Sequence, residues 1–550
     1  MSATVARSSL AMAGGSVASR ILGVVRQSLI TLAIGQGLVG NAFTTANTLP
    51  NIVYMVIAGG VLNSVFVPQL VKAAAHPDGG REYTDRLLTL TISGFLVVTV
   101  LVTVGAPLLV KAYAASLTGS AFELTVYFAM ITLPQTFFYA LYGLLGQVLN
   151  ARGRFTAFGW APAAANVVAI AGLVLFLRNF QGHATPAEWT PAMIWLFAGS
   201  ATAGIVTQAL ILVVALWRDG FRWRPRFGLR GVGLRATSQL AGWAMASLLV
   251  SQLIFLVSSQ VIWHATGSTE ASPTDGGVFV PGISVQSNAM LVFMVPHALV
   301  TLSILTAIYP RISRWSRDRD LAALRSDYVR GLTVPAALTI PASAALIVLA
   351  VPIMGLLFTS RNPAEIPASA LVLSALAPAL LPFGVDTLNQ RMFYALEDGR
   401  TALTEQVVLT ATAVTVALVA LTVRPEWTVP VIALGLVASN TAATAYGMRA
   451  LRRRIGDYGA KAVVRTWVRM ALASVGAGYL AWGPAVLLGR STASWGRLGY
   501  AVTILIAGSF FTMAYLVLAR LFQVRELAVI AAPLVNRLDR RPPGRHRDDD

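Results

Sequence analysis

The sequence contains no cysteine and few charged residues, and both shortages narrow what the chain can be. Without cysteine, neither a disulfide framework nor a thiolate metal site is possible. Only 12% of the 550 residues are charged, whereas an average soluble domain carries about 25%. Such a chain has too little polar surface to coat a soluble globule, and its 56% hydrophobic content excludes a disordered chain.

Catalytic signatures are missing as well. The sequence has no G-x-x-x-x-G-K-[ST] phosphate loop, no G-x-S-x-G elbow and no H-E-x-x-H pair. No group of histidine and acidic residues has metal-ligand spacing. We therefore predict that the protein is not an enzyme and needs no metal or cofactor, which favours transport over catalysis.

Long apolar runs dominate what is present, and the mean hydropathy is +0.68. A membrane-spanning helix needs roughly 20 apolar residues. Segments of this kind lie at 9–34, 42–71, 87–113, 122–149, 156–177, 192–217, 237–264, 283–309, 331–358, 367–396, 403–423, 428–448, 466–488 and 498–520. We predict an all-α polytopic membrane protein with about 14 transmembrane helices, the first of them retained in the mature chain.

The net charge of +19 is distributed unevenly over the predicted loops. Most lysines and arginines fall at one set of span boundaries. The opposite set holds only Lys111, Arg178, Arg361, Arg424, Arg490 and Arg497. Because cytoplasmic loops collect lysine and arginine, the pattern predicts a multi-pass membrane protein with both termini in the cytoplasm. The positive charge then reflects topology, and no nucleic-acid partner is expected.

A weak internal repeat indicates two related halves. The same separation links Pro50 to Pro296 and Gly153-Arg154 to Gly399-Arg400. We predict two six-helix lobes plus two extra C-terminal helices. The segments are an N-lobe at 1–217, a basic linker at 218–235, a C-lobe at 236–450, two further spans within 451–522 and a tail at 523–550. Repeated lobes around a central site are a common transporter plan.

Two arginines inside the first span are the leading functional candidates. At about 100° per residue, Arg20 and Arg26 share one polar stripe with Ser16, Ser19, Gly23 and Gln27. A charge at bilayer depth costs about 2.5–3.5 kcal/mol on insertion scales, and the span holds no acid to offset it. An anionic ligand such as a phosphate would offset it, because the arginine fork binds phosphate through two hydrogen bonds. Snorkelling of one arginine to the helix end is the structural alternative.

Other polar residues within spans are weaker candidates. The second span carries Asn41 and Asn51 at helical spacing, with Pro50 interrupting its hydrogen-bond ladder. Asp386 and Arg391, near the tenth span, are poorly spaced to pair with each other. His297 follows Pro296 and is more typical of a packed histidine than of a proton carrier. We retain Pro50, Asp386, Arg391 and His297 as possible coupling or gating residues.

Several runs resemble the MurJ (MviN) family of bacterial lipid II flippases, within the multidrug/oligosaccharidyl-lipid/polysaccharide exporter superfamily. The runs are Ser19-Arg20-Ile21-Leu22-Gly23-Val24-Val25-Arg26, Ala46-Asn47-Thr48-Leu49-Pro50-Asn51, Val65-Phe66-Val67-Pro68 and Gly146-Gln147-Val148-Leu149-Asn150-Ala151-Arg152-Gly153-Arg154. The resemblance covers about residues 8–520, and the arginine-rich, lysine-poor composition is typical of actinobacterial members.

The resemblance implies a central cavity that binds the diphosphate of undecaprenyl-linked disaccharide-pentapeptide and presents it alternately to each side. Arg20 and Arg26 match the arginines expected to hold the diphosphate, and Ser19 and Asn51 match positions beside that site. Asn41, a further substrate-binding candidate, matches a position that is acidic in many members. Tyr54 stands where many members have arginine and is retained as a substrate-binding candidate. Leu291 also replaces an arginine. The implied cavity is therefore less basic than usual.

The resemblance implies that the protein transfers lipid II outward across the bacterial inner membrane for peptidoglycan synthesis. The membrane potential or a sodium or proton gradient would drive it, with membrane lipids and the cell-wall synthesis machinery as further partners. A flippase for another lipid-linked oligosaccharide, a drug/cation antiporter and a non-transporting cell-wall scaffold remain alternatives. An antiporter would need an acidic cavity, which the first-span arginines argue against.

Overall fold

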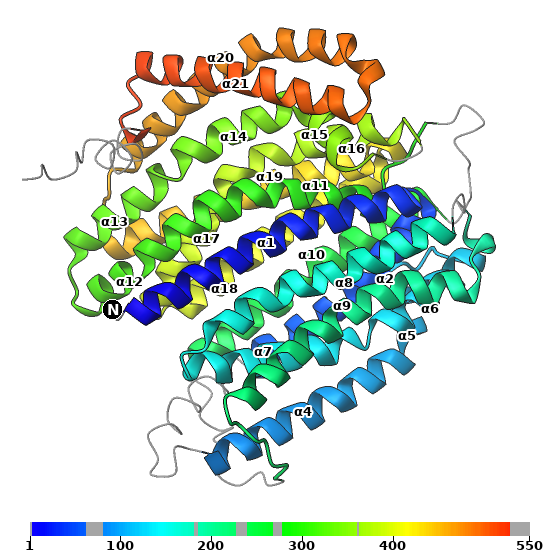
Figure 1. The fold of residues 1–550 in the computed structure, drawn as a ribbon. Coiled ribbons are helices and arrows are strands. Elements are labelled where there is room, and N and C mark those ends of the chain that lie inside the picture. Colours follow the sequence, from blue (N-terminus) through cyan, green and yellow to red (C-terminus); the bar gives the residue numbers. More distant parts are fainter. Residues whose placement is uncertain are drawn as a thin grey trace, which may run out of the picture. The chain divides into compact units, whose positions relative to one another are not determined.

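The computed structural model describes residues 3–61, 81–180, 185–226, 239–267, 278–359 and 362–527. Within these ranges every regular element is a helix and no strand occurs (Figure 1). Thirteen helical segments are long and apolar enough to cross a membrane. The prediction of an all-α polytopic membrane protein is confirmed.

The first half of the chain forms the helices α1 (Ala3–Ile34), α2 (Leu38–Val61), α4 (Arg81–Val104), α5 (Ala106–Tyr113), α6 (Gly119–Thr132), α7 (Gln135–Ala151), α8 (Phe155–Asn179), η2 (Pro186–Glu188), α9 (Pro191–Arg218) and α10 (Gln239–Thr266). The second half forms α11 (Ile283–Pro296), the π-helix η5 (His297–Leu302), α12 (Ser303–Arg317), α13 (Leu321–Thr333), α14 (Ala336–Val348), α15 (Ala350–Leu357), α16 (Glu365–Leu376), η6 (Ala377–Ala379), α17 (Leu380–Ala395), α18 (Gly399–Val419), η7 (Ala420–Thr422), α19 (Pro425–Ile455), α20 (Ala460–Ser491), η8 (Ala493–Trp495) and α21 (Arg497–Leu521).

Thirteen of the predicted apolar segments correspond to these thirteen spans. The second predicted segment, 42–71, begins as α2, and its residues 62–71 lie outside the described ranges. Parts of the predicted linker (227–235) and tail (528–550) also lie outside them. The division into lobes stays a prediction.

Three predicted spans, 87–113, 122–149 and 331–358, are divided where the sequence pattern gave a continuous run, and two of the breaks occur at a single residue. The helix breaks at Gly105, between α4 and α5, and at Leu349, between α14 and α15. In both places a proline, Pro107 or Pro352, follows shortly after the break. Proline has no backbone N–H, so it fits the first turn of a new helix better than the interior of a long one.

The described chain packs as two compact units. One comprises Met1–Leu291, Met354–Val372 and Gly399–Ser439, and the other comprises Val292–Ile353, Leu373–Asp398 and Asn440–Asp550. Each unit has its own core. The units are described separately below.

In the first unit, α1 packs along α8, α8 packs on α9, and α2 packs on α6 and α7 (Figure 1). Glycines allow the closest approach. A Cβ at Gly15 would lie 2.5 Å from the carbonyl oxygen of Gly159, and a Cβ at Gly159 would lie 2.8 Å from the Cα of Met12. Small residues at such crossings are the usual solution in membranes, where van der Waals packing drives helix association. This packing fixes the position of α1, the helix that carries Arg20 and Arg26.

In the second unit, α20 and α21 pair and pack on α14. Alanines and aromatics fill the interface, and the Tyr515 hydroxyl donates to the carbonyl oxygen of Ala337 at 2.9 Å. Trp467 likewise donates its indole N–H to the carbonyl oxygen of Leu332 at 2.9 Å. Both bonds satisfy a polar atom at the edge of an apolar contact, as aromatic residues with a polar tip commonly do.

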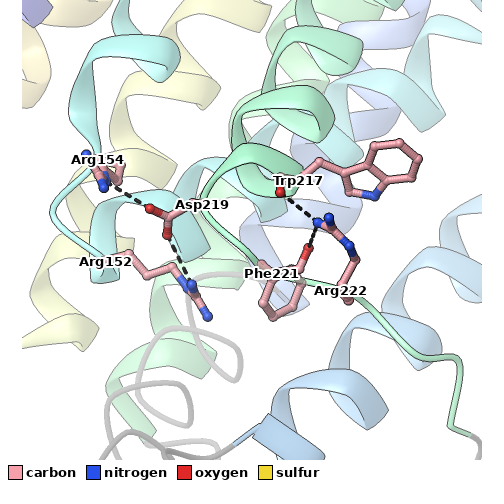
Figure 2. A network of polar contacts seen from close by, with 6 residues as sticks. All are labelled: Arg152, Arg154, Trp217, Asp219, Phe221 and Arg222. Atoms are coloured by element: carbon pink, nitrogen blue, oxygen red, sulfur yellow. Dashed lines mark hydrogen bonds and ion pairs between the residues drawn. The ribbon is translucent and has the colours of Figure 1, made fainter.

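The turn between α7 and α8 is tied to the end of α9 by two arginines (Figure 2). Arg152 Nη1 lies 3.1 Å from Asp219 Oδ2, and Arg154 Nε lies 2.9 Å from Asp219 Oδ1. The guanidinium of Arg152 also lies 5.0 Å from the ring centre of Phe221. Gly153 between the arginines has φ +71°, a left-handed conformation that glycine adopts without strain. The two basic side chains thereby converge on one carboxylate.

The Asp219 contact makes a testable contribution to stability. Hydrogen bonds, first of all from Arg152, lower the pKa of Asp219 below its ordinary range. A carboxyl whose pKa is depressed in the folded state stabilises that state above its ordinary pKa, and the stabilisation is lost as the pH falls through the folded pKa. We expect Asp219→Asn to lower the unfolding temperature slightly at pH 7, and the difference from the unmodified protein to shrink below about pH 4.

Asp318→Asn is the matched control, because Asp318 is half exposed and lies 3.7 Å from Arg317. Thermal unfolding of the purified proteins should leave this variant unchanged at both pH values. Equal melting of Asp219→Asn and the unmodified protein at pH 7 would contradict the assignment.

Candidate functional site

The polar stripe predicted for the first span lies on α1, and some of its members are satisfied locally. Ser16 donates to the carbonyl oxygen of Met12 at 3.0 Å, within its own helix. Gln27 donates to Asn288 Oδ1 on α11 at 2.8 Å. Neither side chain is free to serve as the main ligand contact, which leaves the two arginines.

Arg26 is buried in part and lacks protein partners. Its Nε is shielded from solvent without a hydrogen-bond acceptor, and no hydrogen bond or ion pair of Arg26 occurs in the described part of the chain. The hydroxyl of Tyr139 on α7 lies within electrostatic range of the guanidinium. Buried polar groups are normally satisfied, and an unpartnered donor on a cation is costly. A positively charged group with an unsatisfied donor is suited to bind an anion.

Tyr139 is itself held by a short polar chain. Its hydroxyl donates to Gln135 Oε1 at 3.4 Å, Gln135 Nε2 donates to Thr202 Oγ1 at 2.9 Å, and Thr202 donates to the carbonyl oxygen of Ile131 at 2.9 Å. The chain connects α6, α7 and α9. The ring beside Arg26 is therefore positioned by three helices rather than by one.

Arg20 and Ser19 lie more than one helical turn before Arg26, and their surroundings differ from those of Arg26. Arg20 is exposed and has no hydrogen bond or ion pair with any described residue. Ser19 accepts from Asn166 Nδ2 on α8, at 3.0 Å through its carbonyl oxygen and at 3.3 Å through Oγ. The serine thus helps to hold α1 against α8, while its hydroxyl proton remains available for donation.

On α2, the predicted interruption at Pro50 does not end the helix, which runs from Leu38 to Val61. Pro50 is buried, and its carbonyl oxygen accepts from Thr136 Oγ1 at 3.4 Å. Asn51 is exposed, and its amide reaches only the sulfur of Met55, at 3.8 Å. Asn51 therefore keeps most of its hydrogen-bonding capacity, as a ligand contact would.

Asn41 is engaged with the protein. It is 3% exposed, and its Oδ1 accepts from the backbone N–H of Ser284 at 3.0 Å and from Ser284 Oγ at 2.8 Å. These bonds satisfy donors at the first turn of α11, which has no acceptor of its own there. Its role in binding a substrate stays a prediction, and its observed role is to cap a helix.

Sequence reasoning missed a buried polar network in the first unit. Gln36, between α1 and α2, is fully buried, and its backbone N–H donates to Glu365 Oε2 on α16 at 3.1 Å. Asn288 on α11 donates to Gln36 Oε1 at 2.8 Å and to Thr31 Oγ1 at 3.1 Å. Ser369 adds a further donor to Gln36 Oε1 at 3.2 Å. The network joins helices from distant parts of the sequence around one buried carboxylate.

Glycine geometry makes room for this network. Gly35 has φ +67°, and a Cβ placed on it would lie 3.2 Å from Glu365 Oε1. The sequence signals for this network are three polar residues within or beside apolar runs: Gln36, Asn288 and Glu365. None of them alone indicates a buried network. Their partners are unknown until the fold brings them together.

In the second unit, the predicted coupling residues gather on η5, α12 and α17. His297 is 3% exposed, its ring centre lies 4.7 Å from that of Phe383, and its Nδ1 has no hydrogen-bond partner in the described chain. Arg391 lies within electrostatic range of His297, and its guanidinium sits 5.6 Å from the ring centre of Tyr309. Asp386 has one buried oxygen, Oδ1, without a partner among the described residues. No ion pair joins Asp386 to Arg391 in that part of the chain, as their spacing predicted.

Thr301 completes this group on η5, one turn after His297. It is 2% exposed, and its Oγ1 is also buried without a partner in the part of the chain that the structure describes. A Cβ on Gly384 of α17 would lie 3.3 Å from that oxygen. π-Helical turns are often found at functional sites, and here one carries two unsatisfied polar side chains.

A family model described as "Lipid II flippase MurJ" matches residues 30–506 of the chain. Among curated proteins, the probable lipid II flippase MurJ of Rickettsia prowazekii (strain Madrid E) is 25% identical over 410 residues, covering 73% of this chain and 75% of that protein. The probable lipid II flippase MurJ of Rhizobium meliloti (strain 1021) is 28% identical over 400 residues, covering 70% of each.

Solved structures show the same fold. A lipid II flippase MurJ in an inward closed conformation matches with a TM-score of 0.71 at 16% identity, covering 94% of this chain and 99% of that one. An inward-facing multidrug resistance MATE family transporter of the MOP superfamily matches with a TM-score of 0.64, also at 16% identity, covering 80% and 95%. At these identities the likeness concerns the fold alone.

The Glu365 network yields a prediction about stability. Glu365→Ala removes the acceptor of the buried Gln36 backbone N–H and should lower the free energy of unfolding by about 1–3 kcal/mol, the usual penalty for an unsatisfied buried donor. Glu365→Gln keeps one carbonyl oxygen, so its free energy of unfolding should lie between those of Glu365→Ala and the unmodified protein. Thermal unfolding in detergent measures both.

Glu123→Ala serves as the control, because Glu123 is an exposed acid on α6. It should leave the unfolding temperature unchanged. If Glu365→Ala were no less stable than Glu123→Ala, the network would not be a structural element.

Proposed function

The chain belongs to the lipid II flippase MurJ family, and we propose that it performs this family's transport step by holding the substrate's diphosphate against Arg26. The family makes the protein a lipid II flippase, a membrane transporter and not an enzyme. Its many apolar helices make it a multi-pass inner-membrane protein. Lipid II is its substrate, and no covalent bond changes during the transfer.

One observation supports the proposed site: Arg26 lies within the candidate span Gly14–Ile34, and its buried Nε has no acceptor among the described residues. A diphosphate supplies oxygen acceptors and negative charge together. Arginine offers five donors in a planar fork, so it can bind such a group through two bonds at once. The same contacts replace the hydration that the headgroup loses on leaving water.

Arg20 extends the site along α1. It lies six residues before Arg26, which is about 9 Å along a helix axis, and it has no partner in the described chain. We propose that the exposed Arg20 attracts the headgroup and that Arg26 holds it, with Ser19 and Asn51 as neighbouring donors. Asn41 is less suited to direct contact because Ser284 occupies its oxygen.

Alternating access is the mode of transport that this fold supports. The lipid tails can remain in the bilayer while the headgroup crosses, and the energetic obstacle is then the polar headgroup alone. We propose that both termini face the cytoplasm, as the distribution of basic residues indicates. Contacts with the cell-wall synthesis machinery stay a prediction.

Arg26→Ala tests the site. We expect the variant to insert and fold normally, to bind undecaprenyl diphosphate roughly 10–100-fold more weakly, which is the scale of hydrogen bonds to charged groups, and to fail to support growth when the native flippase is depleted. Arg26→Lys keeps the charge but loses the fork and should be intermediate.

Arg178→Ala is the control, because Arg178 is exposed at the end of α8, away from the stripe. It should bind and complement normally. Normal growth of a variant lacking both Arg20 and Arg26 would refute the assignment. Equal transport of a capsule-type lipid-linked oligosaccharide would favour the broader substrate class instead.

The energy source is a separate proposal, centred on Asp386. An ionised carboxylate oxygen left unpartnered within a span is unfavourable by several kcal/mol, so a bound proton or sodium ion would stabilise it. Two further buried atoms of the second unit that have no hydrogen-bond partner in the described chain, His297 Nδ1 and Thr301 Oγ1, lie on η5, which packs against α17. We propose that the ion which drives transport, a proton or sodium, loads at Asp386, with Arg391 and His297 tuning the local charge.

Asp386→Asn should abolish the dependence of transport on an imposed ion gradient. In proteoliposomes, the unmodified protein should respond to a sodium or proton gradient, whereas the variant should show a single, gradient-independent rate. Asp398→Asn is the control, since Asp398 is paired with Arg454 at 2.7 Å. A variant that still responds to the gradient would exclude Asp386 as the loading group.

A further inference from the structure

One face of α9 ends in an exposed tryptophan where the helix reaches the end of its candidate span, Pro191–Arg218. Leu210 is 51% exposed, Val214 47% and Trp217 63%, and their spacing places them on one helix face. The opposite face is buried, and α9 packs on α7 and α8. An exposed apolar stripe on a span faces lipid, and tryptophan near the end of a span is typical of the membrane–water interface.

The chain that follows α9, residues 221–226, is bonded to the start of α4, and we call this segment the strap. The backbone N–H of Arg224 donates to Asp85 Oδ1 at 3.3 Å, and that of Arg226 donates to Thr89 Oγ1 at 3.0 Å. Because these bonds use the backbone, they fix the path of the strap and leave its arginine side chains exposed.

Within the strap, Arg222 is held against Trp217 (Figure 2). Its Nη1 donates to the carbonyl oxygen of Trp217 at 2.6 Å and to that of Phe221 at 3.4 Å. Its guanidinium lies 5.4 Å from the ring centre of Trp217, and the face of an indole attracts a cation at such a distance. Both hydrogen bonds use Nη1, so the Nε and Nη2 donors of Arg222 have no acceptor in the described chain.

The positive charge of the strap is not neutralised by the acid beside it. Asp219, the nearest acidic residue along the chain, is already shared by Arg152 and Arg154 (Figure 2). Neither Arg222 nor Arg224 forms an ion pair with any residue that the structure describes. The strap therefore presents uncompensated guanidinium groups at the end of a lipid-facing stripe.

Membrane topology alone does not require this arrangement. Basic residues that set topology need only stay on one side of the membrane, and freely moving side chains meet that requirement. Arg222 is instead fixed by two hydrogen bonds and an aromatic ring. A donor that is already ordered loses less conformational entropy when it binds a ligand. The geometry is therefore that of a binding site.

We propose that Trp217 and Arg222 bind the phosphate of an anionic phospholipid, in the leaflet that this end of α9 reaches, with Arg224 adding positive charge beside them. The acyl chains of such a lipid would lie along the exposed stripe of Leu210 and Val214, and its phosphate would meet the free donors of Arg222. A soluble acidic protein would leave the apolar stripe unused, so the combination of stripe and arginine favours a lipid.

Arg222→Gln tests the site in the purified, delipidated full-length protein. Titration with phosphatidylglycerol, followed by native mass spectrometry, should show binding about tenfold weaker than in the unmodified protein, the scale of one lost hydrogen bond to a charged group. The thermal stabilisation that phosphatidylglycerol gives should shrink accordingly. Without lipid the two proteins should melt together, because Arg222 is exposed and bonds only to backbone carbonyls.

Arg465→Gln is the matched control, because Arg465 is an exposed arginine of α20 on the same predicted side of the membrane. It removes the same charge from a place without a fixed guanidinium, and the affinity for phosphatidylglycerol should not change. Equal weakening by Arg222→Gln and Arg465→Gln would overturn the proposal, because the lipid would then respond to the general positive charge of the loops.

A second variant tests the part played by the aromatic ring. Trp217→Leu keeps an apolar side chain at the end of the stripe but removes the ring that holds the guanidinium of Arg222. This variant should also bind phosphatidylglycerol more weakly. An unchanged affinity would exclude Trp217 from the site.

Undecaprenyl diphosphate distinguishes this site from the transport site. Arg222→Gln should bind undecaprenyl diphosphate with unchanged affinity, whereas Arg26→Ala should lose that affinity and keep its affinity for phosphatidylglycerol. If Arg222→Gln weakened the binding of undecaprenyl diphosphate and not that of phosphatidylglycerol, the strap would contact the substrate, and the phospholipid site would be refuted.

Discussion

The proposed function depends on one constraint: the guanidinium of Arg26 lies within an apolar helix that contains no acidic residue. Arg26 keeps a buried Nε with no protein acceptor, although insertion of such a charge costs about 2.5–3.5 kcal/mol. The surrounding residues hold Arg26 in this position and do not supply the missing acceptor. Glycine contacts press α1 against α8, and Tyr139 is held beside Arg26 by its own hydrogen-bonded chain. On the proposed function, this charge is available to an anion, and the fold tolerates its energetic cost when no anion is bound.

Hydropathy was enough to predict the helices, because each span must satisfy its backbone within one continuous helix and present apolar side chains to lipid. It also placed Arg20 and Arg26 on one face of α1, since helical periodicity is a local property. Contacts between distant segments could not be predicted in this way. Asn41 was expected beside a ligand, yet its oxygen caps α11. Glu365 stood at a span boundary, and nothing local indicates that Gln36, far earlier in the chain, donates to it.

The internal repeat is clearer in the helix boundaries than in the sequence. The break at Gly105 is separated from the break at Leu349 by the same number of residues as the left-handed Gly153 from the left-handed Glu397. That register differs by two residues from the one that the Gly-Arg pairs indicated. The turns are also tied in a related way with the charges reversed. Arg154 on the first turn pairs with Asp219, whereas Asp398 on the second pairs with Arg454. The positions of the helix breaks and turns therefore match more closely than the residues that form them, so a sequence comparison indicates the repeat only weakly.

A transporter must bind its cargo firmly enough to desolvate it and loosely enough to release it on the other side. Several arginines converging on one diphosphate would meet the first requirement at the expense of the second, because each bidentate ion pair in a low-dielectric site is strong. The proposed site has one partly buried guanidinium, that of Arg26, and the predicted contacts Tyr54 and Asn51 are uncharged. Neither Tyr54 nor Asn51 has an oxygen acceptor among the described residues. When the phosphate leaves a neutral donor, water can take its place at a smaller loss of free energy than when the phosphate leaves an arginine. The proposed site would therefore recognise the diphosphate by the number and direction of its donors and would keep the electrostatic barrier to release low.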